Sequence, residues 1–133
     1  FVIDELAGWQ NAYDSTVGRR LLEEMVVRDV NHPSIVLWSN GNEGGWNTAL
    51  DKYFSCYDPQ QRHVIHPWAD FNGLDTHHYP AYLTGVGRFT NGYNVFMPTE
   101  FMHGQYDQGH GAGLEDFWAN YTSHPLFAGV GFL

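Results

Sequence analysis

Short apolar runs and longer stretches with helical spacing follow one another along this chain. The short runs predict strands, over residues 1–4, 34–40, 64–66, 74–79, 95–99 and 127–133. Apolar residues spaced three and four apart predict helices, over residues 15–28, 46–57 and 114–121. Strands that alternate with helices indicate an α/β fold with a parallel sheet.

Local signals set several expected boundaries. Asp14 or Ser15 can cap the first helix, and the Asp58-Pro59 step should end the second. The run 34–40 is apolar without a break, so we expect a strand buried on both faces. Cys56, the single cysteine, should lie on the apolar face of its helix as a small buried residue.

The composition indicates a folded chain and excludes some classes of partner. Its 133 residues are 43% hydrophobic and 17% aromatic, which fits one globular domain. Charged residues make up 16%, below the roughly 25% that is usual, so we expect part of the surface to be covered. A formal net charge of −9 argues against nucleic acid and against an anionic membrane surface. No apolar run approaches the roughly 18 residues of a membrane span.

Two carboxylates follow two of the predicted strands. Glu43 comes soon after the run 34–40, and Glu100 ends the run 95–99. The carboxyl ends of barrel strands carry catalytic side chains, and glycoside hydrolysis needs two carboxyl groups. The chain has only 6 basic residues, so structural ion-pair partners for these glutamates are scarce.

Residues 28–45, which include His32-Pro33 and Asn42-Glu43, resemble the acid/base segment of family 2 glycoside hydrolases. This is the β-galactosidase and β-glucuronidase group. Residues 98–104 resemble the nucleophile segment of the same family. Three further stretches also fit, at residues 76–79, 114–118 and 127–129.

The resemblance implies a role for several residues. Glu43 would be the general acid/base and Glu100 the nucleophile, as in a double displacement. Asn42 would bind the sugar 2-hydroxyl, and Tyr79 would hydrogen-bond the nucleophile. His78 and His103 are candidates to bind sugar hydroxyls or Glu100.

Other candidates have a plain alternative. Asp4 and Glu5 would face the barrel mouth and bind sugar hydroxyls, or form only a solvated acidic pair. Trp46 and Trp68 could stack on sugar, although either could be structural, and Trp38 reads as core. The spacing of the histidines does not favour a zinc site.

The implied fold is a partial (β/α)₈ TIM barrel, roughly strands 3 to 8. Residues 1–133 would be the C-terminal part of the catalytic domain, truncated at both ends, and the accessory β-domains of the full-length chain would be partners. Related β-galactosidases hold magnesium with a Glu and a His of the third strand. Leu6 stands where that His would be, so we expect no cofactor.

The implied activity is hydrolysis of terminal β-D-galactosides with retention of configuration. A β-glucuronidase, a β-mannosidase or an inactive carbohydrate-binding remnant are the alternatives. We expect the isolated 133 residues to be inactive, because a partial barrel leaves strand edges and core exposed.

Overall fold

The computed structural model of the protein describes residues 1–80, 82, 94–102 and 113–129. The chain divides into two compact units, residues 1–67 and residues 68–133. In the described residues, no helix combines the length and the apolar character that a membrane crossing requires.

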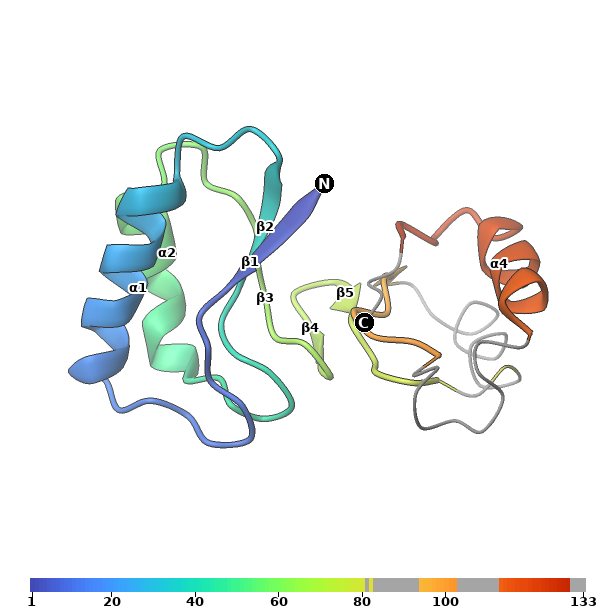
Figure 1. The fold of residues 1–133 in the computed structure, drawn as a ribbon, viewed down its shortest axis with the longest axis horizontal. Helices are drawn as coiled ribbons and strands as arrows, with labels where there is room; N and C mark the ends of the chain where they lie inside the picture. Colours follow the sequence, from blue (N-terminus) through green and yellow to red (C-terminus); the bar gives the residue numbers. More distant parts are fainter. Residues whose placement is uncertain (81, 83–93, 103–112, 130–133) are drawn as a thin grey trace. The chain divides into compact units, whose positions relative to one another are not determined.

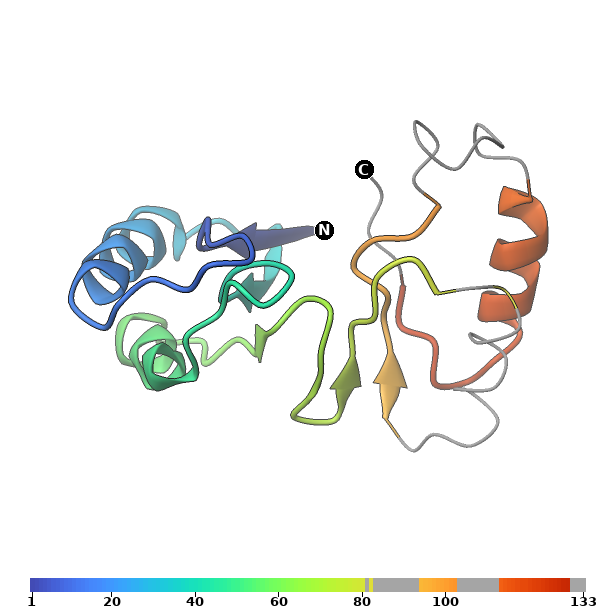
Figure 2. The ribbon, with the colours of Figure 1, turned by 90° about the horizontal axis from the view of Figure 1, so that it is seen from below.

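The first unit is a three-stranded parallel sheet with helices on one side (Figures 1 and 2). Its sheet has the order β1-β2-β3. The elements along the chain are β1 (Val2–Glu5), α1 (Val17–Asp29), β2 (Ile35–Ser39), the 3-10 turn η1 (Thr48–Leu50), α2 (Asp51–Tyr57) and β3 (Val64–Ile65). The predicted strands and helices of this half are therefore confirmed. The first strand and the first helix each end one residue later than predicted, and the other elements are shorter than predicted.

The core of this unit lies between the sheet and the two helices. Leu22 and Val26 are four residues apart on α1, so both face inward. They meet Trp38 from β2 and Phe54 from α2, and all four side chains are fully buried. Burial of each such side chain stabilises the fold by about 1.5–3 kcal/mol.

Side chains and backbone fix the helix ends. The Asp14 carboxylate accepts hydrogen bonds from the amides of Thr16 (2.7 Å) and Val17 (2.9 Å), as the capping prediction requires. The second helix does not begin at residue 46, because the Asn47 side chain accepts the Ala49 amide at 3.1 Å and starts a 3-10 turn.

Two burial predictions in this unit are wrong. Val36 is 40% exposed. In the β1–β2 register Val2 pairs with Ile35 and Ile3 with Leu37, so Val36 is the extra residue of a bulge. Cys56 is exposed as well. It follows Phe54 by two residues, and that spacing turns it away from the buried face of α2.

The second unit contains a smaller sheet and one helix. Strands β4 (Asp70–Phe71), β5 (Leu74–Asp75) and β6 (Val95–Phe96) lie in that order. The β5–β6 pair is parallel and the β4–β5 pair is antiparallel. Helix α4 (Leu114–Thr122) packs an aromatic core, made of Phe96, Phe101 and Tyr121 with Phe117 and Phe127 around them.

Three strand predictions in this unit need correction. The β4–β5 hairpin was not predicted, although Asn72 and Gly73 both have positive φ and form its two-residue turn. The strands predicted over 74–79 and 95–99 are each two residues long. Of the strand predicted over 127–133, the described residues show a single bridge between Phe96 and Phe127.

Candidate active site

Glu43 lies in the loop that follows β2, and two side chains from the loop after β1 hold it. The indole Nε1 of Trp9 donates to Glu43 Oε2 at 2.7 Å, and the amide Nε2 of Gln10 donates to the same oxygen at 2.9 Å. The backbone of Glu43 has a φ of 46°. A non-glycine residue rarely takes this conformation, which is concentrated at functional sites.

Close backbone packing joins these two loops. The Asn42 amide donates to the Gly8 carbonyl at 2.5 Å, and the Asn42 carbonyl accepts the Gln10 amide at 3.0 Å. A Cβ added to Gly8 would lie 2.4 Å from the Gly45 carbonyl oxygen. Only glycine therefore permits this approach, which brings Trp9 and Gln10 to Glu43.

The sequence did not single out Trp9 and Gln10. Both lie a few residues beyond the carboxyl end of β1, at the sheet edge from which Glu43 also projects. Barrel enzymes place functional side chains at this edge. That position was the available signal, because neither residue belongs to a motif that we recognised.

The side chains of Asp4 and Glu5 point in different directions, so the prediction that both face the barrel mouth is wrong. Glu5 accepts a hydrogen bond from Ser39 Oγ on the neighbouring strand at 2.8 Å. Asp4 points instead toward α1, where its carboxyl pairs with that of Asp29. Burial raises the pKa of Asp4, and the hydrogen bond and charge of Asp29 raise it further. Successive residues of a strand point to opposite faces, which separates these two carboxyl groups.

A buried polar network lies at the carboxyl ends of β2 and β3. The Asn40 amide donates to Asp51 Oδ1 at 2.6 Å, and the same oxygen lies 2.9 Å from His66 Nε2. The Trp46 ring stacks on the His66 ring, with centroids 5.8 Å apart and planes 10° apart. Trp46 thus has a structural neighbour, and sugar stacking by this residue stays a prediction.

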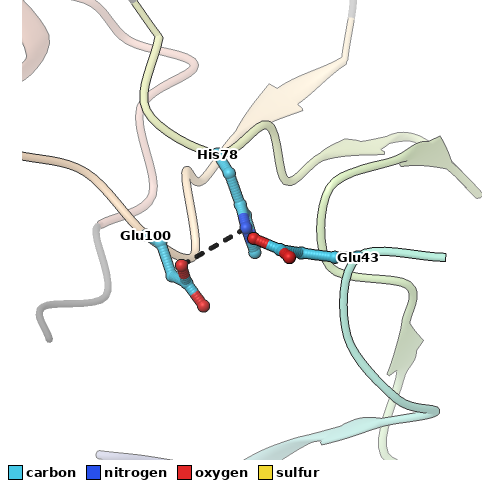
Figure 3. Close-up of side chains that lie close together, drawn as sticks. All are labelled: Glu43, His78 and Glu100. Carbon is cyan, nitrogen blue, oxygen red and sulfur yellow. Dashed lines mark ion pairs between the residues drawn. The ribbon is translucent and has the colours of Figure 1, made fainter. Parts of the chain in front are cut away.

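In the second unit, Glu100 lies beside His78 and Tyr79. The Tyr79 hydroxyl donates to Glu100 Oε2, the hydrogen bond that the sequence motif predicted. His78 Nδ1 lies 3.4 Å from the same oxygen, and Figure 3 draws this ion pair. The Tyr79 amide also donates to the Glu100 carbonyl at 2.8 Å, which fixes the two backbones together.

A second contact holds His78 through its other ring nitrogen. His78 Nε2 lies 2.9 Å from Thr99 Oγ1, and the Thr99 hydroxyl donates to the Thr76 carbonyl at 3.2 Å. The imidazole is therefore held between Thr99 and Glu100.

The remaining candidates are dispersed. Trp68 is 51% exposed, and Trp38 is fully buried in the core as predicted. Leu6 is 5% exposed and packs in the first core, so it presents no metal ligand. His103 lies outside the described residues. Roles for Asn42, Glu5 and His78 toward sugar stay predictions.

Part of the chain matches a known family. Residues 7–66 match the family described as "Glycosyl hydrolases family 2, TIM barrel domain". This stretch includes Glu43, Trp9 and Gln10. The stretch that carries Glu43 is therefore similar to the TIM-barrel domain of this family of glycoside hydrolases.

Curated relatives support the same family. The chain is similar to "Beta-galactosidase" of Aeromonas hydrophila, 48% identical over 46 residues, which is 35% of this chain and 4% of the relative. It is 43% identical over 54 residues to "Beta-galactosidase" of Kluyveromyces lactis, covering 38% of this chain and 5% of the relative. The matched stretches thus span only a small part of these relatives.

A solved structure supports the fold. The chain is similar to "Faecalibacterium prausnitzii Beta-glucuronidase", with a TM-score of 0.59 and 19% identity. The match covers 87% of this chain and 27% of that structure. The fold is therefore of the TIM-barrel type, while the described strands form two short, unclosed sheets.

Proposed function

We propose that this chain carries both catalytic carboxylates of a retaining β-glycosidase. In the first step Glu100 attacks the anomeric carbon, while Glu43 protonates the departing oxygen. In the second step Glu43 takes a proton from water, which then releases the sugar from Glu100. The result is hydrolysis with net retention.

The observation that carries this proposal is the environment of Glu100. The Tyr79 hydroxyl and the His78 imidazole both face its Oε2 oxygen. These contacts fix the position of the Glu100 carboxyl group, and a positioned carboxylate is the nucleophile of a double displacement. A glutamate with only a structural role at the end of a strand would not need Tyr79 or His78 beside it.

The proposal includes the remaining barrel. Residues 1–133 would contribute roughly strands 3 to 8, and accessory β-domains of the full-length chain would complete the enzyme. Asn42, His78 and Glu5 would bind sugar hydroxyls. Leu6 offers no ligand atom, so no step is assigned to a metal.

A terminal β-D-galactoside is the first substrate to test. Two relatives, 48% identical over 46 residues and 43% identical over 54 residues, are named β-galactosidases, which favours this sugar. The structural relative is named a β-glucuronidase, so a β-glucuronide comes next. A β-mannoside completes the panel, and an inactive sugar-binding protein is the alternative of a different class.

Glu100→Gln in the full-length protein separates enzyme from binder. We expect the parent protein to cleave one aryl β-glycoside of the panel with retention, read by NMR of the first product formed. The variant should lose nearly all turnover, while Glu115→Gln, at an exposed carboxyl of α4, should keep it. Sugar binding without turnover by the parent would establish the binding alternative.

A further inference from the structure

We propose that Trp9 and Gln10 are positioning residues that orient the Glu43 carboxylate for proton transfer. This inference rests on the proposed function of Glu43. The two side chains form a donor pair, because both give their hydrogen bond to one oxygen, Oε2. A carboxylic acid whose Oε2 accepts two N–H donors carries its proton on Oε1, and that is the proton a general acid transfers.

The chemistry of the carboxyl group determines which oxygen of Glu43 carries the proton. An oxygen that already accepts two N–H donors at 2.7 Å and 2.9 Å is a poor place for a proton. A general acid works only when its proton points at the leaving oxygen. By occupying Oε2, the donor pair of Trp9 and Gln10 selects Oε1 and fixes the rotation of the carboxyl plane.

Packing does not explain why Trp9 is held in place. Its side chain is 65% exposed, so it contributes little to the core. Its backbone pairs with that of Asn42, and Gln10 donates its amide to the Asn42 carbonyl. The backbone of Trp9 and Gln10 is therefore fixed to Asn42, the residue directly before Glu43.

The leaving group gives a test that separates orientation from stability. A phenyl glycoside needs a proton on the departing oxygen, whereas a 2,4-dinitrophenyl glycoside leaves without one. The variants Trp9→Phe and Gln10→Leu each delete one donor in the full-length protein. The value of kcat/KM reports the glycosylation step with both substrates.

We expect each variant to lose about tenfold or more of kcat/KM on the phenyl β-glycoside, since the lost hydrogen bond stabilises the carboxylate that forms as Glu43 gives up its proton. On the dinitrophenyl β-glycoside of the same sugar, kcat/KM should stay within about twofold of the parent value, because this leaving group departs without a proton. The matched controls are Trp118→Phe, at another exposed indole, and Asn11→Leu, at an exposed amide of the same loop. Both should leave the ratio of kcat/KM for the two substrates unchanged.

An equal loss on both substrates would make the donor pair merely structural and overturn the inference, as would no loss on either. If one variant fails to fold, the other still decides, because each removes a separate donor. A parent that cleaves neither substrate, of any sugar in the panel, would instead refute the proposed function of Glu43 itself.

Discussion

Glu100 presents one oxygen to two neighbours of different chemistry, a phenol and an imidazole. Tyr79 reaches it with a backbone φ of 44°, a conformation that costs free energy in a residue other than glycine. Such strain persists where the surrounding structure over-determines it, and here the Tyr79 amide is bonded to the Glu100 carbonyl. Backbone and side chain of Tyr79 are therefore both bonded to Glu100.

Removal of the Tyr79 hydroxyl should slow the proposed reaction. A hydrogen bond to a charged group contributes about 1.5–3 kcal/mol, so we expect Tyr79→Phe to lower kcat/KM by about 10- to 100-fold. Steady-state kinetics of the full-length protein measure this. Tyr57→Phe removes a hydroxyl bonded to Glu23 and should change little. Equal effects of the two variants would deny Tyr79 a role at Glu100.

Asp58 is a buried charge with a complete set of partners. It accepts Trp38 Nε1 at 2.8 Å and pairs with Arg62 at 3.1 Å. Burial alone would raise the pKa of Asp58, but the hydrogen bonds of Trp38 and the backbone, with the charge of Arg62, hold it below its usual value of 3.8. The ionised form therefore contributes to stability.

We expect Asp58→Asn to destabilise the protein by about 3 kcal/mol at neutral pH, since it leaves Arg62 buried without its partner charge. Because the folded pKa of Asp58 is depressed, this contribution is fully present above the unfolded pKa of 3.8 and is lost as the pH falls below 3.8 through the lower folded pKa. Melting temperatures of parent and variant should thus converge in acid. A constant difference at every pH would contradict this account, and Asp116→Asn on α4 is the exposed control.

Residue by residue, the sequence predicted the side chains that belong to recognisable motifs. Glu43, Glu100 and Tyr79 stand in such motifs, and Tyr79 does contact Glu100. Trp9 and Gln10 do not, because the direction of a side chain in a loop depends on backbone packing between segments distant in the sequence. The prediction for Asp4 and Glu5 failed for a different reason, since adjacent residues of a strand point to opposite faces and the sequence already places them side by side.

Among the elements, the loops after β1 and β2 depend on glycine. A Cβ on Gly41 would lie 2.5 Å from the Gly45 carbonyl oxygen, whereas one on Gly73 would meet nothing within 4 Å. Both glycines have similar positive φ values, 93° and 81°. A side chain at Gly41 would clash and one at Gly73 would not, whereas the free-energy cost of the left-handed backbone is similar at both positions.

This match makes Gly73→Ala a control for Gly41→Ala. Each should lose about 1–2 kcal/mol for a left-handed residue with a side chain. Gly41→Ala should lose further stability and lower kcat/KM, because the displaced loop carries Glu43. Thermal melts and kinetics of the full-length protein measure both effects. Indistinguishable variants would show that the close packing of Gly8, Gly41 and Gly45 is unimportant.

Element types were easier to predict than element ends. The helices at 15–28 and 114–121 follow their apolar spacing closely, as α1 and α4 show. The bulge at Val36 could not be predicted, because it is a property of the β1–β2 register rather than of either strand. The β4–β5 hairpin could have been, since Asn72-Gly73 is a strong turn signal.

At the scale of the molecule, apolar side chains remain on the surface of the described residues. Val2, Val27 and Trp118 are 45%, 58% and 46% exposed, and charged residues are few. We expect the isolated 133 residues to aggregate and to cleave no aryl glycoside, while the full-length protein is active. A cooperative melt with turnover by the isolated chain would overturn this expectation.

The roles of the two glutamates can be tested together by azide rescue in the full-length protein. On a 2,4-dinitrophenyl β-glycoside, Glu100→Gly with azide should give the α-glycosyl azide, since azide replaces the nucleophile. Glu43→Gly should give the β-glycosyl azide, since azide attacks the glycosyl-enzyme that Glu100 still forms. These two products, identified by NMR, are the predicted result. The reverse assignment, or one anomer from both variants, would contradict the proposed mechanism.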